Sequence, residues 1–194
     1  MMLRLCRSIV ILLMAVVLPN ISMASAKTAS ELVSLLNEGG HIALMRHALA
    51  PGTGDPTDVV IGDCSTQRNL SDTGRKQANA AGEYLKSLGL DDAIIYTSQW
   101  CRCRETAALL GFGVPIDFSA LNSFFELRQN EAPQMRELRR WLRSETLERP
   151  VILVTHQVVI TALTGAFTSS GEIVVVRKLE NGSVELVGAI PPGQ

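Results

Sequence analysis

The sequence predicts one α/β domain, a three-layer α/β/α sandwich with helices on both faces of a mostly parallel sheet. Short apolar runs at 41–45, 93–97 and 151–155 alternate with segments of helical periodicity, which is the pattern of βαβ units. The run at 151–155, VILVT, is almost wholly apolar, as expected of a strand that helices cover on both faces. The ligand crevice of such a sheet lies beyond the carboxyl ends of its strands.

The first two expected helices lie at 29–37 and 71–88. Leucines three or four residues apart mark the first helix, which two glycines at 39 and 40 close. Ser71 is expected to cap the second helix, whose buried face includes Tyr84, and Gly89 to end it. The segment 50–68 between strand and helix is rich in glycine, proline and aspartate, and we expect a long functional loop there.

The rest of the chain continues the alternation. Ser98 is expected to cap a third helix that runs to residue 110. Pro133 is expected to start an amphipathic helix, and Asn181-Gly182 predicts a hairpin. The expected elements after residue 110 are a strand at 114–118, a helix at 133–143, a strand at 151–155, a helix at 158–167, and strands at 173–179 and 184–190.

Residues 1–26 have the organisation of a secretory signal peptide. Two arginines precede an apolar stretch at 9–18, and small residues in the A-x-A arrangement end at Ala26. The apolar stretch is shorter than the ~20 residues that a membrane-spanning helix needs. We expect cleavage after Ala26, one domain at 27–194 with no stable membrane anchor, and a periplasmic or secreted location. The alternative is an uncleaved anchor.

Charge and cysteine content narrow the class of protein further. The net charge of −1 offers no basic excess, so nucleic acid is not an expected partner. After the leader the chain has Cys64, Cys101 and Cys103, too few sulfur ligands for a closed zinc site. In an oxidising compartment we expect Cys64 to bridge Cys101 or Cys103; the alternative is three buried free thiols.

Two histidines and two arginines follow three of the expected strands. Arg46 and His47 come directly after the run at 41–45, and His156 comes directly after the run at 151–155. Arg102 lies one turn inside the helix that Ser98 is expected to open, after the strand at 93–97. If these strands are neighbours in a parallel sheet, the four side chains converge at one edge.

Four segments of the sequence resemble motifs of the histidine phosphatase, or phosphoglycerate mutase-like, superfamily. Together they extend over most of the region from about 39 to 165, in the order in which that superfamily has them. The segments are LMRHA at 44–48, RNLSDTGRKQA at 68–78, SQWCRCRETA at 98–107 and VTH at 154–156.

The resemblance implies a phosphoglycerate mutase-like fold and a metal-free phosphatase without a cofactor. His47 would be the nucleophile that forms a phosphohistidine, and Arg46, Arg102 and His156 would bind the phosphoryl oxygens. These residue types suit that chemistry, because phosphoryl transfer needs positioning and charge stabilisation on the equatorial oxygens. Guanidinium groups bond such oxygens in a fixed planar geometry, and a histidine nucleophile must be neutral.

A proton donor for the leaving alcohol is missing from that set. Glu126 is the best-placed candidate by order along the chain, and Asp55 and Asp58 in the long loop are two others. The competing interpretation of Glu126 is a structural one, in which it pairs with Arg128 or caps a turn. A substrate with a good leaving group, such as phosphohistidine, would need no acid.

The departures from the superfamily pattern favour a small phosphatase over a mutase. Ala48 stands where many members have glycine, and Gln157 follows His156 in place of the aspartate of the acid phosphatase branch. The expected function is hydrolysis of a small-molecule phosphomonoester, such as an envelope sugar phosphate, with the segments 50–68 and 121–133 reading the substrate. The alternatives are a protein phosphohistidine phosphatase and a catalytically idle phosphate-binding or scaffold domain.

Overall fold

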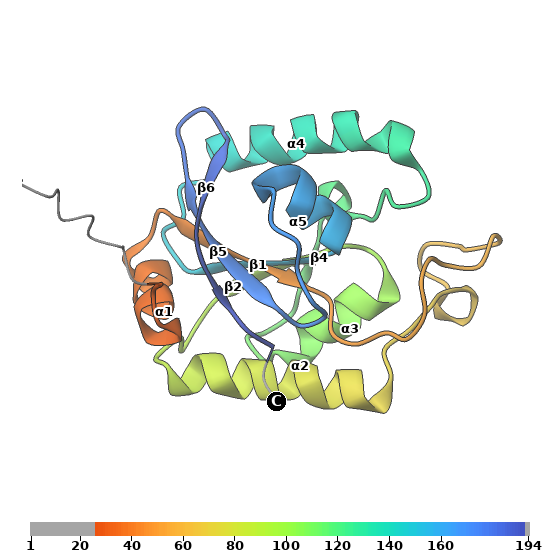
Figure 1. The fold of residues 1–194 in the computed structure, drawn as a ribbon, viewed down its shortest axis with the longest axis horizontal. Coiled ribbons are helices and arrows are strands. Elements are labelled where there is room, and N and C mark those ends of the chain that lie inside the picture. Colours follow the sequence, from red (N-terminus) through yellow and green to blue (C-terminus); the bar gives the residue numbers. More distant parts are fainter. Residues whose placement is uncertain (1–25, 193–194) are drawn as a thin grey trace, which may run out of the picture.

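The structure is a computed structural model that describes residues 26–192. The expected signal peptide at 1–26 lies, apart from Ala26, outside the described residues. Six strands form one sheet in the order β3-β2-β4-β1-β5-β6 (Figure 1). The strands are β1 (His41–Arg46), β2 (Ile94–Thr97), β3 (Ile116–Asp117), β4 (Val151–Thr155), β5 (Ile173–Lys178) and β6 (Val184–Ile190).

The sheet is mostly parallel, as the sequence predicts. β1 pairs parallel with β4, and β2 pairs parallel with both β4 and β3. β5 pairs antiparallel with β1 and β6, so within residues 26–192 it runs against the other strands. The three strands that precede the candidate site residues are therefore adjacent, in the order β2-β4-β1, and their carboxyl ends lie at the same edge.

Helices cover both faces of this sheet, which confirms the three-layer architecture (Figure 1). Successive residues of β1 point to opposite faces: Ala43 and Met45 pack with the first three helices, and Ile42 and Leu44 with the other two. The helices are α1 (Ala29–Glu38), α2 (Asp72–Ser87), α3 (Cys101–Leu109), α4 (Glu131–Ser144) and α5 (Gln157–Thr164), with short 3₁₀ turns η1 (Cys64–Thr66), η2 (Ser119–Leu121) and η3 (Arg128–Asn130).

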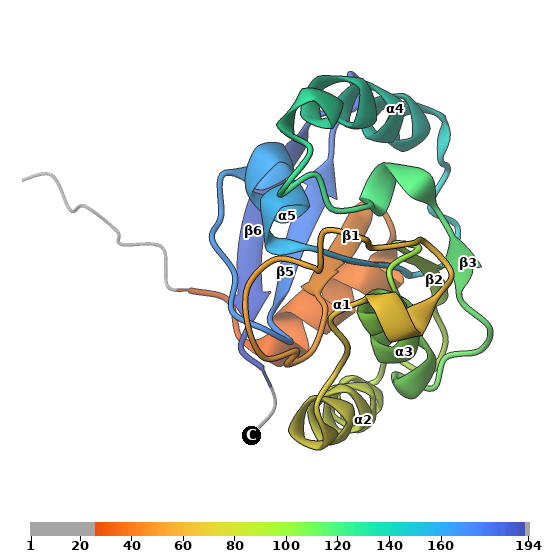
Figure 2. The same cartoon turned by 90° about the vertical axis from the view of Figure 1, so that its right-hand side faces the viewer.

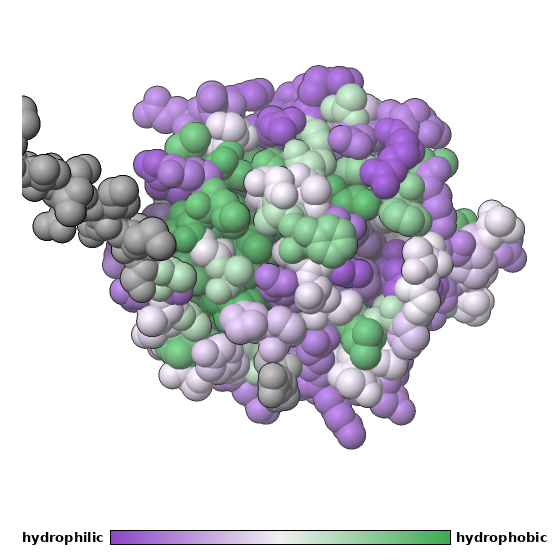
Figure 3. Space-filling model, in the orientation of Figure 1, coloured by the Kyte–Doolittle hydropathy of each residue, from purple (hydrophilic) through white to green (hydrophobic). Residues whose placement is uncertain are grey.

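α4 is strongly amphipathic. Met135, Leu138 and Leu142 are buried against the sheet and α5, whereas the other face carries arginines and glutamates. Figure 3 shows these hydrophilic side chains along the edge of the molecule that α4 forms. Across residues 26–192, none of the helices has the length and hydropathy that a bilayer crossing requires.

α2 lies directly on the start of the long loop. Ser71 caps this helix as predicted, its hydroxyl accepting from the N–H of Gly74. A Cβ atom on Gly74 would lie 2.1 Å from the carbonyl oxygen of Leu49, so a side chain there would push the helix and the loop apart. Glycine at this position therefore allows the backbone that follows β1 to pack directly against the first turn of α2.

The predicted start of α3 is wrong. The helix begins at Cys101 with Trp100 at the N-cap position, and the N–H of Ser98 donates instead to the carbonyl of Val154 in β4. The buried side chain of Gln67 takes over the capping, its Oε1 accepting from the N–H of Cys101 at 2.9 Å. Arg102 is consequently the second residue of α3 and not one turn inside it.

Two smaller predictions also fail. Tyr84 is 41% exposed, so it does not belong to the buried face of α2. The last helix ends at Thr164 and not at Phe167, because Gly165 adopts the left-handed conformation (φ 78°) that terminates helices. Phe167 then lies beyond the helix and is largely exposed. The remaining elements begin and end within two residues of their predicted bounds.

Candidate active site

The carboxyl ends of β1, β4 and β2 bring the predicted histidines together. Arg46 pairs with Thr155 in register, and the N–H of His47 donates to the carbonyl of Thr155 at 2.9 Å. His156 follows Thr155 directly and is the N-cap residue of α5. Figure 2, which views the molecule from this side, shows the loop after β1 passing in front of the sheet edge. The first expectation from the sequence, convergence at one edge, is met.

His47 is held as a neutral imidazole with one nitrogen free. It is 3% exposed, and its Nδ1 lies 2.8 Å from the carbonyl of Ala48, which requires Nδ1 to carry the proton. Burial lowers the pKa of His47 to about 3, and the charges of Arg102, Arg68 and Arg46 act in the same direction. Nε2 is therefore unprotonated at neutral pH and available to a ligand.

His156 lies next to it and is fully enclosed. Its ring meets that of His47 edge-on, with centroids 5.4 Å apart, and meets the ring of Trp100 in the same way at 5.6 Å. Its Nε2 is 2.9 Å from the hydroxyl of Ser98. Burial lowers the pKa of His156 well below its ordinary value, with a further contribution from His47 and the arginines. Both histidines are thus uncharged in the folded protein.

This burial makes stability depend on pH. We expect acidification from pH 7 to pH 4 to cost wild type about 3 kcal/mol more folding free energy than it costs a His47→Asn variant. Unfolded His47 binds a proton below about pH 6.5, whereas the folded protein keeps it neutral down to about pH 3. The unfolded state binds more protons between these values, so stability rises with pH there. Urea unfolding at both pH values measures the difference; equal pH dependence would contradict a neutral, buried His47.

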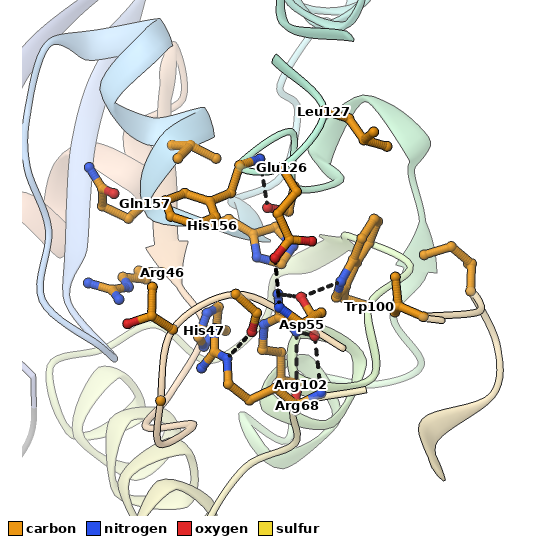
Figure 4. Close-up of a pocket in the computed structure, with 18 residues that line it drawn as sticks. Arg46, His47, Asp55, Arg68, Trp100, Arg102, Glu126, Leu127, His156 and Gln157 are labelled. Atoms are coloured by element: carbon orange, nitrogen blue, oxygen red, sulfur yellow. Dashed lines mark hydrogen bonds and ion pairs between the residues drawn. The ribbon is translucent and has the colours of Figure 1, made fainter. Parts of the chain in front are cut away.

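Arg102 is buried and paired with Asp55, a contact that the sequence did not predict. Its NH1 and NH2 donate to the two carboxylate oxygens of Asp55 at 2.7 and 2.9 Å, and both side chains are almost inaccessible to solvent. Trp100 Nε1 donates to the same carboxylate at 3.1 Å. Asp55 thus fixes the orientation of both Arg102 and the Trp100 ring (Figure 4).

These contacts decide the ionisation of Asp55. Burial acts to raise its pKa, but the hydrogen bonds and charge of Arg102, together with the N–H of Arg68, outweigh burial and hold the pKa below its usual value. Asp55 is therefore an ionised partner of Arg102 at neutral pH. An ionised carboxylate has no proton to donate, which argues against Asp55, one of the candidates from the sequence, as the proton donor.

Arg68 is a third arginine of the site that the sequence analysis missed. Its half-buried side chain lines the same cavity, with Nε donating to the carbonyl of Gly54 at 2.8 Å and NH1 donating to the carbonyl of Ala50. The guanidinium thereby ties the end of the loop to its beginning. The available signal was its place as the first residue of the RNLSDTG segment, three residues before the cap of α2.

Arg46 faces the cavity from the end of β1. Its NH1 donates to the carbonyl of Thr168 at 2.6 Å. Among the described residues, three buried side-chain nitrogen or oxygen atoms have no hydrogen-bond partner, and two of these are Nε of Arg46 and Nε of Arg102. Unsatisfied buried N–H groups are costly, so the two arginines retain donor capacity for an anionic ligand.

These groups surround a cavity of about 290 Å³. Arg46, His47, Arg102, His156 and Glu126 all line it, so the structure brings together the five residues that the sequence singled out. Glu126 reaches over the site from the segment before η3, and its Oε1 accepts from the backbone N–H of Asp55 at 2.9 Å (Figure 4).

The structure also bears on Asp58, the remaining acid candidate, and on the expected pairing of Glu126 with Arg128. Asp58 is exposed and does not line the cavity, so the structure does not bring it to the site. Arg128 lies over the ring of Phe125, 5.6 Å from its centroid, whereas Glu126 accepts a hydrogen bond from the backbone N–H of Asp55 in the long loop. Glu126 therefore contacts the loop and not Arg128. Residues 26–192 hold no group of three or more His, Cys, Asp or Glu side chains arranged for a metal ion.

A disulfide bridge ties the loop to α3. Cys64 of η1 is bonded to Cys101, the first residue of α3, whereas Cys103 is a buried free thiol. The expected bridge from Cys64 is therefore present, and of the two possible partners it takes Cys101. Burial raises the pKa of Cys103 to about 12, which keeps that thiol protonated. The bridge joins Cys101, which directly precedes Arg102, to Cys64, which lies four residues before Arg68.

The fold and the site together define an α/β protein in which two neutral histidines and three arginines line one cavity. Residues 42–128 match the sequence model of the histidine phosphatase superfamily (branch 1), which confirms the resemblance seen in the motifs. Over these residues, which are fewer than half of the chain, the sequence is similar to the histidine phosphatase superfamily. Among curated protein sequences, none matches this chain.

Solved structures with this fold include three informative neighbours. The protein histidine phosphatase SixA complexed with tungstate is 14% identical, with a TM-score of 0.54 over 78% of this chain and 97% of its own. The product of open reading frame Rv3214 from Mycobacterium tuberculosis is 22% identical, with a TM-score of 0.57 over 79% and 98%. The mycobacterial glucosyl-3-phosphoglycerate phosphatase complexed with VO₃ is 19% identical, with a TM-score of 0.52 over 70% and 92%. At these identities the likeness shows the fold.

Proposed function

We propose that the protein is a phosphatase that hydrolyses a small phosphomonoester through a covalent intermediate on His47. Nε2 of His47 attacks phosphorus, the bond from phosphorus to the ester oxygen breaks, and the alcohol leaves with a proton. Water then attacks the phosphohistidine, which releases inorganic phosphate and restores the imidazole. The observation that carries the proposal is the buried His47, neutral with Nε2 free and surrounded by arginines.

The charge of the cavity suits a phosphate dianion. Arg46, Arg68 and Arg102 contribute three positive charges, and the ionised Asp55 offsets one of them. The unpartnered Nε atoms of Arg46 and Arg102 supply donors for phosphoryl oxygens. Preorganised positive charge of this kind stabilises the transition state of phosphoryl transfer. Two proteins of the same fold are complexed with the oxyanions tungstate and VO₃, which supports an oxyanion as ligand.

We propose an exported, periplasmic or secreted location for the enzyme. The A-x-A sequence ending at Ala26 favours cleavage of the leader. The Cys64–Cys101 bridge supports the same location, because structural disulfides form and persist in oxidising compartments.

Release of inorganic phosphate from a panel of sugar, alkyl and aryl phosphates tests the proposed function. We expect turnover in the presence of EDTA, since the three arginines supply the charge stabilisation that a metal ion would otherwise provide. A wild-type protein that binds phosphate but releases none from any ester would instead be an idle phosphate-binding domain.

Glu126 is our candidate for the proton donor. It lines the cavity, and the one carboxylate oxygen that accepts from Asp55 N–H leaves the other oxygen free to carry a proton. Its exposure gives it access to solvent, from which it can be reprotonated between turnovers. Asp55, by contrast, is committed to Arg102 and Trp100.

The leaving group decides how much a Glu126→Gln variant loses. We expect kcat for alkyl phosphates to fall on the order of 10²–10⁴-fold, because an alkoxide needs a proton in the transition state. Hydrolysis of 4-nitrophenyl phosphate is expected to fall far less, since nitrophenolate leaves without one. A plot of log kcat against leaving-group pKa measures this: the slope steepens in the variant.

A uniform loss for all esters would assign Glu126 a role in holding the loop through Asp55 and not in proton transfer. The matched control is Glu131→Gln, because Glu131 begins α4 and does not line the cavity. Phosphohistidine-containing peptide in the same assay addresses the alternative function. A protein that hydrolyses the peptide but no ester would be a phosphohistidine phosphatase.

A further inference from the structure

We infer that the preferred substrate carries an apolar group, alkyl or aryl, next to its phosphate. This inference rests on the proposed phosphatase function and names the substrate class of the same site. Its basis is the wall of the cavity beyond the arginines and histidines. Three segments far apart in the sequence place apolar side chains on that wall, and two of the polar side chains beside them are partly engaged within the protein.

The apolar side chains form a lip, defined here as Val59, Ile61, Phe125, Leu127 and Val158. Val59 and Ile61 come from the long loop, Phe125 and Leu127 from the segment before η3, and Val158 from α5. Ile61, Phe125 and Leu127 are more than one-third exposed even though they line a cavity. Exposed apolar surface gathered around a pocket is typical of a ligand-binding site.

Trp100 extends this apolar surface down to the reacting groups. Asp55 fixes the indole through Nε1, and the ring meets His156 edge-on (Figure 4). The ring is half-buried and lines the cavity, so it forms a rigid wall between the lip and the phosphate-binding groups. A planar aryl group or an alkyl chain on the ester oxygen would lie against this wall.

Two of the polar side chains on the same wall are partly engaged within the protein. Gln157 Nε2 donates to the hydroxyl of Thr161 at 2.9 Å, and Ser123 Oγ accepts from the N–H of Phe125 at 3.2 Å. Sugar hydroxyls need partners when they leave water, and an unpaired buried hydroxyl is costly. Only an ester without many hydroxyls gains from the lip. An envelope sugar phosphate, the example expected from the sequence, fits this wall less well.

The volume of the cavity fits a short apolar group. About 290 Å³ is at the lower end for small-molecule sites. It accommodates the phosphate and the first part of the alcohol, and a longer chain would pass over Ile61 and Leu127 into solvent. The same chemistry could belong to a soluble alkyl or aryl phosphate or to the phosphate headgroup of a lipid.

A series of n-alkyl phosphates tests the inference. Primary alcohols differ little in pKa, so changes in kcat/KM along the series report binding and not leaving-group chemistry. We expect kcat/KM to rise about twofold to fourfold for each methylene that the lip buries, or about 20-fold or more from ethyl to hexyl phosphate. Glucose 6-phosphate, also a primary ester, is expected to remain at or below the level of ethyl phosphate.

Matched variants locate the preference. Phe125→Ser and Leu127→Ser are expected to bring the ratio of hexyl to ethyl phosphate toward one. Phe167→Ser and Leu186→Ser make the same changes at exposed positions outside the cavity, and there the ratio should keep its wild-type value. Leu186 is a close control, because it is 47% exposed and Leu127 is 48% exposed.

The outcomes separate the inference from the proposed function. If no ester is hydrolysed, the phosphatase function itself fails. If esters are hydrolysed without dependence on chain length, or sugar phosphates are preferred, the function stands and the apolar class is wrong. Dioleoyl phosphatidic acid in mixed micelles distinguishes the sources: turnover there as well as on hexyl phosphate supports a lipid ester, and turnover of hexyl phosphate alone supports a soluble one.

Discussion

A His47→Asn variant is expected to lose phosphatase activity by a factor on the order of 10⁴ or more, together with all covalent labelling. Loss of a nucleophile costs this much because the remaining groups bind the substrate but cannot form the intermediate. Asparagine keeps a donor for the carbonyl of Ala48, so the local packing is preserved. The loss would then reflect the missing Nε2 and not a collapsed site.

Labelling is measured by mixing enzyme with a ³²P-labelled ester and denaturing it at alkaline pH, where the phosphorus–nitrogen bond survives. The matched control is His41→Asn, at the opposite end of β1, whose Nδ1 is close to the carbonyl of Gly39. That variant should label as wild type does. An active His47→Asn protein, or label on a different residue, would refute the role of His47.

Breaking the Arg102–Asp55 pair from one side is expected to destabilise the protein by about 3–5 kcal/mol. Asp55→Ala leaves an almost inaccessible guanidinium without its partner, and Arg102→Met leaves an unpaired carboxylate. The double variant removes both charges, so it should be more stable than the sum of the two single changes implies. Urea unfolding of the four proteins completes the double-mutant cycle.

An exposed ion pair provides the control. Asp92 and Arg149 form a salt bridge in which both side chains are more than half exposed, so Asp92→Ala should cost about 1 kcal/mol or less. If Asp55→Ala costs no more than Asp92→Ala, the pair is not buried in solution. Activity is expected to be lost in both single variants at the site, because Asp55 holds Arg102 in place and Arg102 lines the cavity that we propose binds the substrate.

The sequence predicted the strands and the histidines because both depend on local pattern. An apolar run such as 151–155 indicates a strand by itself, and a polar residue directly after the run marks the sheet edge. Once β2, β4 and β1 are neighbours, the position of His47 and His156 follows from chain geometry.

The loop could not be predicted in this way. Residues 50–68 contain no periodicity, and their structure depends on contacts with distant residues: Asp55 with Arg102, and Gln67 with the start of α3. The last of these also explains why Ser98 was wrongly taken as the cap of α3. A side chain from 34 residues earlier satisfies the free N–H of Cys101, and no local motif records it.

The choice between Cys101 and Cys103 likewise needed the structure. Two residues apart on a helix, their side chains point in very different directions, so only one can face the loop. Cys103 faces the core, where it contacts the carbonyl of Thr155 and the ring of His156. Sequence spacing constrained the bridge to two pairings, and helix geometry selects between them.

The Cys64–Cys101 bridge also makes the state of the site depend on the redox conditions under which the protein is produced. The bridge links the loop that carries Asp55 and Arg68 to the helix that carries Arg102, so we expect the activity of each molecule to depend on whether its bridge has formed. Protein made in a reducing cytosol would carry two thiols at Cys64 and Cys101, and protein matured in an oxidising compartment would carry the bridge. The two forms differ in mass by only two hydrogens. A specific activity for this chain is therefore meaningful only beside a thiol count of the same sample.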